Sequence, residues 1–447
     1  MCASGAAYGN GRFPAAQLIH VSTDQRSVAL RVTFGFMISE DGGQNFSWLC
    51  EEALGYGGGV FDPPFVLDAN QRLHVALPDG LARLERDRCS TRRDPGLESQ
   101  FVIDLDRTRD GQTVFAVTSS GAPGARNYVY RAGTSSERFE PLGAGFASDT
   151  LFETIEHAPS DPQRIYLTAV RNSPRRVIFL RSSDGGVTFE ETSLDSFNVD
   201  DGYIAGVDPT NPDRVYVRAP LRDVILPDAG ANASPTALLV TDDGGRTFRE
   251  LVRSVGAMTG FALSDDGATL FFGTQHLADG LQRSRNRGVT FERVAGVHVT
   301  GLRVATNTLW VAANWVLDGF ALGRSVDQGT TIVPAIRSFC DVQGAPACGP
   351  STDVTALCGA RWPVFRSSSL ACPISPAGDA GDAGDAGASP IMDGSTIDDR
   401  GTSGPPGSCR CAIPAVPSRS TRGALWLSAL SLALCATIAR SRASAPA

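Results

Sequence analysis

The chain contains no lysine, so all 40 of its fixed positive charges are arginines, set against 48 acidic residues and a net charge of −8. GC-rich coding is the simplest explanation for the missing lysine, and no chemistry follows from it. The absence of a basic excess argues against a general nucleic-acid-binding protein, which needs positive charge to neutralise phosphates. GxSxG, HExxH, P-loop and dinucleotide-binding motifs are absent as well. We therefore expect no cofactor and no metal.

Glycine and proline are abundant, with 48 and 27 copies, and 42% of the residues are hydrophobic. This composition is typical of a turn-rich, all-β protein rather than a helical or disordered one. At 447 residues, the chain is long enough for one large domain with additional segments.

An octapeptide of the pattern S/T-x-D-x-G-x-T-F recurs along the chain. The strongest copies occupy 39–46, 182–189 and 241–248, weaker copies occupy 284–291 and 325–332, and a decayed copy occupies 132–139. An Asp side chain accepts hydrogen bonds from the backbone N–H groups of a tight turn, and Gly adopts positive φ there. Each octad therefore predicts a β-hairpin tip whose aromatic ring packs between sheets. The third octad residues are expected to be structural rather than catalytic: Asp41, Asp184, Asp243, Asn286 and Asp327.

The octad resembles the Asp-box, or BNR repeat, of sialidases and related β-propellers. Apart from one double-length gap, the octads recur at intervals of about 40–60 residues, the size of a four-stranded propeller blade. The long gap between the first two octads holds three strand patterns within 64–84, which indicate a blade that has lost its box. The Pro/Asp turns before several strands also resemble those of seven-bladed xyloglucanases and photosystem assembly factors. We predict an all-β, seven-bladed β-propeller over 13–337, with no strand exchange to close the ring.

The C-terminal region carries the clearest localisation signal in the sequence. Residues 423–439 form an uncharged run flanked by arginines, and as a helix it would span roughly 25 Å, the short end of a transmembrane length. A buried core helix is the alternative. Cys409 and Cys411, followed by this run and an Arg-bearing tail over 409–447, resemble the MYXO-CTERM sorting signal of myxobacterial surface proteins. That resemblance implies processing near the cysteines and display at the cell surface; an ordinary single-pass anchor is the alternative.

The segments around the propeller give further expectations. Residues 1–12 are expected to be the end of a signal peptide whose front is missing because the start codon is misplaced; cytoplasmic residence is the competing interpretation. Residues 338–374 form a Cys-rich appendage, and 375–408 form a low-complexity linker. Six cysteines suggest three disulfides in an oxidising compartment, with Cys50–Cys89 as the first pair and three connectivities open for Cys340, Cys348, Cys358 and Cys372. Zinc is the rival, but no CxxC spacing supports it.

A ligand site is expected on the face opposite the octads, where loops join strands 2 and 3 and connect successive blades. Acidic, basic and aromatic side chains in these loops form the candidate set: Glu51, Glu52, Tyr56, Glu153, Glu156, Arg171, Arg176, Asp200, Asp201, Tyr203, His276 and Trp315. Aromatic stacking combined with carboxylate hydrogen bonds suits a sugar, and the acidic groups suit a basic peptide. Solvated loop residues without a function are the alternative.

Three functions are carried forward. The first is a non-catalytic, surface-anchored propeller that binds a glycan or a protein. The second is a glycoside hydrolase, sialidase-like or other, with catalytic carboxylates among Glu52, Glu153 and Asp201, because such enzymes need two carboxylates about 5–9.5 Å apart. The absent F-R-I-P motif and the seven units count against a sialidase. The third is a structural or adhesive component of the cell envelope.

Overall fold

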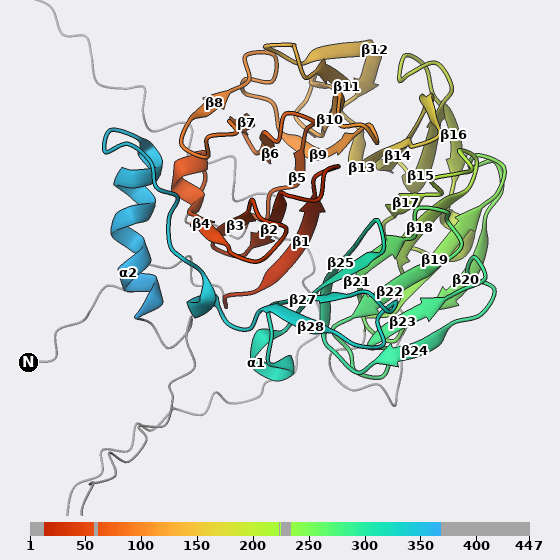
Figure 1. Cartoon of the computed structure of the whole chain (residues 1–447). Helices are drawn as coiled ribbons and strands as arrows, with labels where there is room; N and C mark the ends of the chain where they lie inside the picture. The colour runs from red at the N-terminus through yellow and green to blue at the C-terminus, as the bar shows by residue number, and fades with distance from the viewer. Residues whose placement is uncertain (1–12, 58–60, 223, 225–233, 368–447) are drawn as a thin grey trace, which may run out of the picture. The chain divides into compact units, whose positions relative to one another are not determined.

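The computed structural model describes residues 13–57, 61–222, 224 and 234–367. These residues form seven four-stranded antiparallel sheets, each built from four strands consecutive in the chain. The sheets follow one another around a ring as the blades of a propeller, and the last blade returns to the first (Figure 1). The predicted seven-bladed propeller is therefore confirmed.

Blades 1 to 4 cover the first half of the ring. Their strands are β1 (Ala16–Val21), β2 (Val28–Val32), β3 (Gly35–Ser39), β4 (Ser47–Leu49); β5 (Phe65–Leu67), β6 (Leu73–Leu77), β7 (Gly80–Leu84), β8 (Thr91–Arg93); β9 (Val102–Arg107), β10 (Thr113–Thr118), β11 (Arg126–Gly133), β12 (Glu140–Ala147); and β13 (Thr150–Ala158), β14 (Asp161–Asn172), β15 (Arg175–Ser182), β16 (Glu190–Ser193). The blade without an octad, predicted within 64–84, is present as β5–β8.

Blades 5 to 7 complete the ring. Their strands are β17 (Tyr203–Val207), β18 (Val215–Pro220), β19 (Thr236–Thr241), β20 (Arg249–Arg253); β21 (Met258–Leu263), β22 (Leu270–Thr274), β23 (Leu281–Ser284), β24 (Glu292–Ala295); and β25 (Val299–Ala305), β26 (Thr308–Ala313), β27 (Leu322–Ser325), β28 (Val333–Ile336). Short helices lie between strands: η1 (Glu51–Leu54), η2 (Asp195–Phe197) and α1 (Trp315–Asp318).

The core lies between the blades rather than inside one sheet. Every residue of the second strands β6 and β22 is buried, because neighbouring blades cover both faces of each sheet. The outermost strand β20 is half-buried to exposed along its length. Aromatic rings of the octads fill the gaps between blades, as predicted; the Phe248 ring of blade 5 packs 5.0 Å from that of Phe179 in blade 4.

The octads join the third and fourth strands, as predicted. In blade 4, Oδ1 of Asp184 accepts hydrogen bonds from the backbone N–H groups of Val187 and Thr188 at 3.0 and 2.9 Å, and Oδ2 accepts one from the Thr188 hydroxyl. Gly186 adopts φ = 93° in the same turn. The aspartates are therefore turn residues whose acceptors are already used.

The ring closes without an exchanged strand, in agreement with blades 1 and 7, which each look complete in the sequence. Innermost strand β25 of blade 7 lies directly beside β1 of blade 1. Across this seam, the indole N–H of Trp315 donates to the carbonyl of Pro14 at 3.1 Å, and the Gln25 amide donates to the Thr306 hydroxyl at 2.6 Å. A Cβ on Gly301 would meet the backbone oxygen of Gln17 at 1.7 Å, so the two strands approach as closely as glycine allows.

The predicted Cys50–Cys89 disulfide is wrong. Cys50 is bonded to Cys358 and Cys89 to Cys348, so both bonds run from an early blade to the segment after the last blade. Cys340 is disulfide-bonded as well. Pairing by sequence proximity failed because ring closure brings residues about 300 positions apart into contact.

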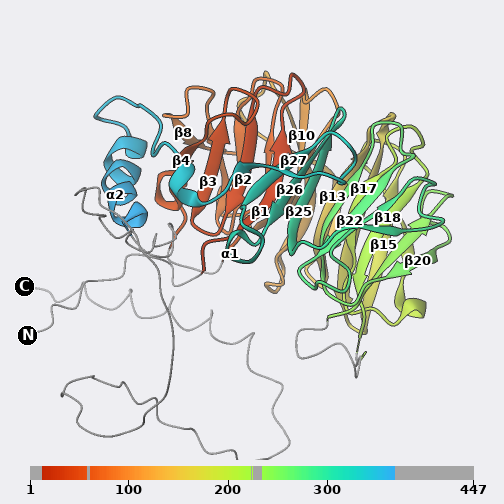
Figure 2. The same ribbon diagram turned by 60° about the horizontal axis from the view of Figure 1, so that its bottom comes forward.

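The segment after blade 7 packs on the outer edge of blade 1. It contains η3 (Phe339–Asp341), η4 (Val354–Gly359) and α2 (Ala360–Arg366). The rings of Trp362 and Trp48 lie 5.4 Å apart, and the Trp48 backbone N–H donates to the Gly344 carbonyl at 2.6 Å. In Figures 1 and 2, α2 stands beside β4 of blade 1. This segment thus covers a sheet edge that would otherwise expose unpaired groups.

Several sequence expectations fall outside the described residues: the 1–12 segment, Cys372, the 375–408 linker, Cys409, Cys411 and the 423–439 run. Among the residues the structure describes, no helix has the length and apolar character needed to cross a bilayer.

Candidate functional site

A central channel of about 690 Å³ is lined by residues of all seven innermost strands. Two predicted carboxylates face it, although from an unexpected place. The sequence assigned Glu153 and Glu156 to a loop between blades, but both lie on the innermost strand β13. The loop preceding this strand is shorter than predicted because β13 begins at Thr150. These two candidates are therefore channel residues rather than loop residues.

The mouth cluster, defined as Glu153, Arg175, Asp201, Tyr203 and Arg218, lies at the channel end opposite the octads. Glu153, Tyr203 and Arg218 line the channel, and Asp201 and Arg175 lie close to Glu153 outside the lining. Tyr203 begins β17, and the Arg175 guanidinium donates to Oδ1 of Asp201 at 3.2 Å. The Arg218 guanidinium lies over the Tyr203 ring, 5.3 Å from its centre, and donates to the Met258 carbonyl. The structure thus brings together three residues that the sequence singled out separately, beside Arg175, which belongs to a predicted loop, and Arg218, which the sequence did not indicate.

Electrostatics in the mouth cluster raise the pKa of both of its carboxyl groups. Burial, reinforced by the neighbouring Asp201, raises the pKa of Glu153 to about 7, while Arg175 opposes the shift. Burial also raises the pKa of Asp201, again against Arg175. Burial and then Glu153 raise the pKa of Tyr203 to about 12, so its hydroxyl stays protonated at neutral pH. At neutral pH, the mouth therefore offers both donors and acceptors.

Deeper in the channel, carboxylates of blade 3 bind the free edge of blade 4. Oδ2 of Asp104 accepts from the Ile155 N–H at 3.0 Å, and Oδ2 of Asp106 accepts from the N–H and Nδ1 of His157 at 2.7 and 2.8 Å. These contacts satisfy backbone donors on an innermost strand that has no further strand to pair with. Burial raises the pKa of Asp104 to about 7.

Positive charge gathers on the wall of the channel at the junction of blades 7 and 1. Burial, followed by Arg303, Arg107 and Arg31, lowers the pKa of His20 well below its ordinary value, which keeps this imidazole neutral. The Arg107 guanidinium of blade 3 reaches the Val21 carbonyl of blade 1 at 3.2 Å. Burial and then Arg303 lower the pKa of Arg107 to about 10, so it remains charged at neutral pH.

The predicted residues near blades 1 and 2 lie in a region separate from the channel. Glu51 and Tyr56 line a smaller cavity of about 340 Å³ beside Phe61 and Asp79. The Glu52 carboxylate forms an ion pair with Arg361 of the segment after blade 7. These three candidates are therefore not part of the channel.

The remaining predicted residues also lie apart from the channel lining. Arg171 pairs with Glu191 at 2.7 Å on blade 4, while Arg176 is exposed on β15. Asp200 pairs with Arg222 at 2.9 Å beside the mouth. His276 lies in the loop between β22 and β23, and Trp315 is buried at the seam.

Several channel residues were missed from the sequence: His20, Asp104, Asp106, Arg107, Arg218 and Arg303. These side chains project from strands rather than from the loops in which a ligand site was expected. A usable signal exists in Val102–Arg107, where Asp104 and Asp106 alternate with apolar residues. Charged residues on one face of an otherwise apolar strand indicate a face that meets water.

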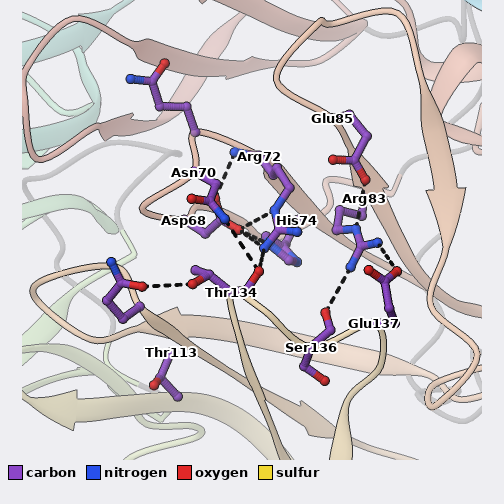
Figure 3. Close-up of polar contacts among 12 residues, drawn as sticks. Asp68, Asn70, Arg72, His74, Arg83, Glu85, Thr113, Thr134, Ser136 and Glu137 are labelled. Carbon is purple, nitrogen blue, oxygen red and sulfur yellow. Dashed lines mark hydrogen bonds and ion pairs between the residues drawn. The ribbon is translucent and has the colours of Figure 1, made fainter.

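A second buried ionic network belongs to the fold rather than to a site (Figure 3). Asp68, whose side chain is fully buried, accepts from Arg72 at 2.7 Å and contacts His74 at 3.1 Å. Arg72 continues to the Thr134 carbonyl of blade 3 at 2.7 Å. This network joins the blade that has no octad to its neighbour. Within the described ranges, no group of three or more His, Cys, Asp or Glu residues has the arrangement of a metal site.

No protein-family model matches the chain, and no curated protein does. Among solved structures, a hydrazine synthase of Kuenenia stuttgartiensis is 11% identical over 73% of this chain and 99% of its own, with a TM-score of 0.46. A functionally unknown protein from Desulfotomaculum acetoxidans is 15% identical over 72% and 96%, with a TM-score of 0.43. A GH74 enzyme of Niastella koreensis is 13% identical over 74% and 70%, with a TM-score of 0.34. Likeness this distant carries no argument about function.

Proposed function

We propose that this β-propeller is a non-catalytic binding module whose ligand enters the central channel through the mouth cluster. The observation that carries the proposal is the convergence of Glu153, Asp201 and Tyr203, with Arg175 and Arg218, at one end of a 690 Å³ channel. A concave site with a few convergent polar groups on a rigid scaffold is the usual form of a small-ligand site.

The size of the channel limits the ligand. A volume of about 690 Å³ admits one or two sugar rings or a single extended peptide segment, and it excludes a folded domain. We therefore propose that a glycan or protein ligand presents a terminal group to the channel. The disulfides support work in an oxidising compartment, and we extend the proposal to display at the cell envelope through the 423–439 run.

Equilibrium binding of oligosaccharides and short peptides to the purified chain tests the proposal. Tyr203→Ala and Asp201→Asn should each weaken binding by about tenfold or more, because they remove a central aromatic ring or a charge at the mouth. Tyr56→Ala is the matched control, since Tyr56 lines the separate 340 Å³ cavity. Equal loss in all three variants, or no loss in the mouth variants, contradicts the proposal.

A glycoside hydrolase is the second candidate. It is favoured by the pKa of Glu153, which burial and Asp201 raise to about 7, as a general acid requires. Turnover of fluorogenic glycosides that disappears in Glu153→Gln and Asp201→Asn would replace the binding module with this enzyme. The absence of turnover, together with retained binding, supports the binding module. If neither binding nor turnover is found, the results favour the structural or adhesive role.

A further inference from the structure

The inference concerns one level of the channel, defined as His20, Asp106, Glu156 and Arg303. These residues occupy the same position in their blades. Each lies opposite a residue of the second strand, and that residue lies opposite the last third-strand residue before the octad. They therefore lie at the same height on the innermost strands of blades 1, 3, 4 and 7. We call this set the charged level.

The two signs of charge stand on opposite walls of the charged level. In a ring of seven blades, blade 4 faces the junction of blades 7 and 1. Glu156, flanked by Asp106 on blade 3, therefore faces Arg303 and His20 across the channel. The same register positions on blades 5 and 6 are Gly206, which has no side chain, and Ala262, which has a small one, so neither fills the space between the walls.

The facing Glu156 and Arg303 side chains are not paired within the described part of the protein. Burial, and then Asp106 and Asp104, raise the pKa of Glu156, while Arg303 lowers it, so the two groups sense each other. Yet neither side chain has a hydrogen bond or an ion pair with any residue that the structure describes, and Nε of Arg303 is buried without a partner. By contrast, Asp104 and Asp106 are held by the backbone of β13. Buried polar atoms are normally paired, so the unpartnered Nε of Arg303 stands out, and among the described residues the half-buried Glu156 on the opposite wall has no partner either.

We propose that the charged level binds a small zwitterion of the α-amino-acid class, with its ammonium group against Glu156 and Asp106 and its carboxylate against Arg303. A lone cation would be repelled by Arg303 and Arg107, and a lone anion would leave the carboxyl groups of Glu156 and Asp106 without a cationic partner. A neutral sugar would leave the Arg303 charge unpaired. This inference rests on the proposed function, because the zwitterion enters the same channel, either free or as the exposed end of a peptide.

Isothermal titration of the purified chain with a panel of free L-amino acids tests the inference. Each binding amino acid is compared with its amide, which lacks the carboxylate, and with its N-acetyl form, which lacks the ammonium group. Both analogues should bind at least about tenfold more weakly, because each leaves one wall charge unpaired. Circular dichroism of every variant confirms that the propeller is folded.

Two substitutions test the contribution of each channel wall to binding separately. Arg303→Gln should weaken binding of the amino acid by about tenfold or more without changing the residual affinity for the amide. Glu156→Gln should weaken binding of the amino acid without changing the residual affinity for the N-acetyl form. Arg138→Gln, in an exposed ion pair with Glu140 on blade 3, is the matched control and should leave every affinity unchanged.

The outcomes are distinguishable from those of the proposed function. If sugars or peptides bind and depend on Tyr203 while no free amino acid binds, the zwitterion inference is overturned and the binding module stands. If the analogues bind as tightly as the amino acid, or both wall variants bind normally, the charged level is not the site. If neither a zwitterion nor a glycan or peptide binds, both proposals fall.

Discussion

At the scale of single residues, two sets of carboxyl groups have opposite pKa shifts. Backbone donation from Thr331 and the hydroxyl of Ser325 lower the pKa of the octad residue Asp327 to about 2. Burial in the channel raises the pKa of Asp104 to about 7. The octad residue Asp327 is hence a charged hydrogen-bond acceptor that stabilises its turn, whereas Asp104 in the channel holds a proton that a surface carboxyl group would lose.

This contrast predicts how stability depends on pH. The folded protein holds the Asp104 proton up to about pH 7, whereas the unfolded chain loses it near pH 4, so this group lowers stability as pH rises from 4 to 7. Asp104→Asn removes that loss and keeps an oxygen for the Ile155 N–H. We expect the variant to match the wild type near pH 4 and to gain on the order of 2 kcal/mol of unfolding free energy at pH 8.

Urea denaturation at pH 4, 6 and 8 measures the Asp104→Asn effect. Asp327→Asn is the control of opposite sign: the lowered pKa stabilises the fold above about pH 4, and this contribution is lost as pH falls through about 2. Asp327→Asn should therefore be less stable than the wild type at pH 6 to 8. An Asp104→Asn gain that is the same at all three pH values would contradict burial as the cause.

At the scale of elements, the sequence predicts hairpins better than it predicts innermost strands. Each octad contains its own turn chemistry, so its position follows from local residues alone. Strand β13 resembles a solvated loop in the sequence, because Glu153 and Glu156 are polar residues that face water in the channel. Their surroundings depend on six other blades, which no local pattern contains. The mouth cluster was predicted in part, and its arginine on β18 was missed for the same reason.

The seam between blades 7 and 1 makes a prediction at this scale. A Cβ at position 301 would lie 1.7 Å from the Gln17 carbonyl oxygen on the neighbouring strand, so Gly301→Ala must force β25 and β1 apart. We expect a loss of about 2 kcal/mol or more in unfolding free energy, as for other overpacked interiors. Chemical denaturation measures it, with Gly349→Ala as the control, since no atom lies within 4 Å of a Cβ there. Equal stability of the two variants would show that the seam can relax.

At the scale of the whole molecule, a segment that belongs to none of the seven blades stabilises the closed ring. Many closed sheets share a strand between the first and last units, but here each blade is made of its own four consecutive strands. The segment after blade 7 takes over that role, because Cys358 and Cys348 bond it to blades 1 and 2. The even number of cysteines indicated disulfides, but their pairing follows from ring closure and was beyond any argument from spacing.

The two disulfides close chain segments of 308 and 259 residues, which gives the last prediction. Joining such distant residues restricts the unfolded chain, so removing Cys50–Cys358 by a double Cys→Ser change should cost about 2–5 kcal/mol of stability. Thermal unfolding followed by circular dichroism measures the loss. The equivalent Cys89 and Cys348 variant should lose a comparable amount, because it too frees the segment that covers β4.

Removing the bonds should also make the segment around 343–348 sensitive to protease before the blades unfold, since it rests on blade 1 mainly through Trp48 and its neighbours. Protease resistance and melting temperatures equal to those of the wild type would mean that strand β25 beside β1 closes the ring without help.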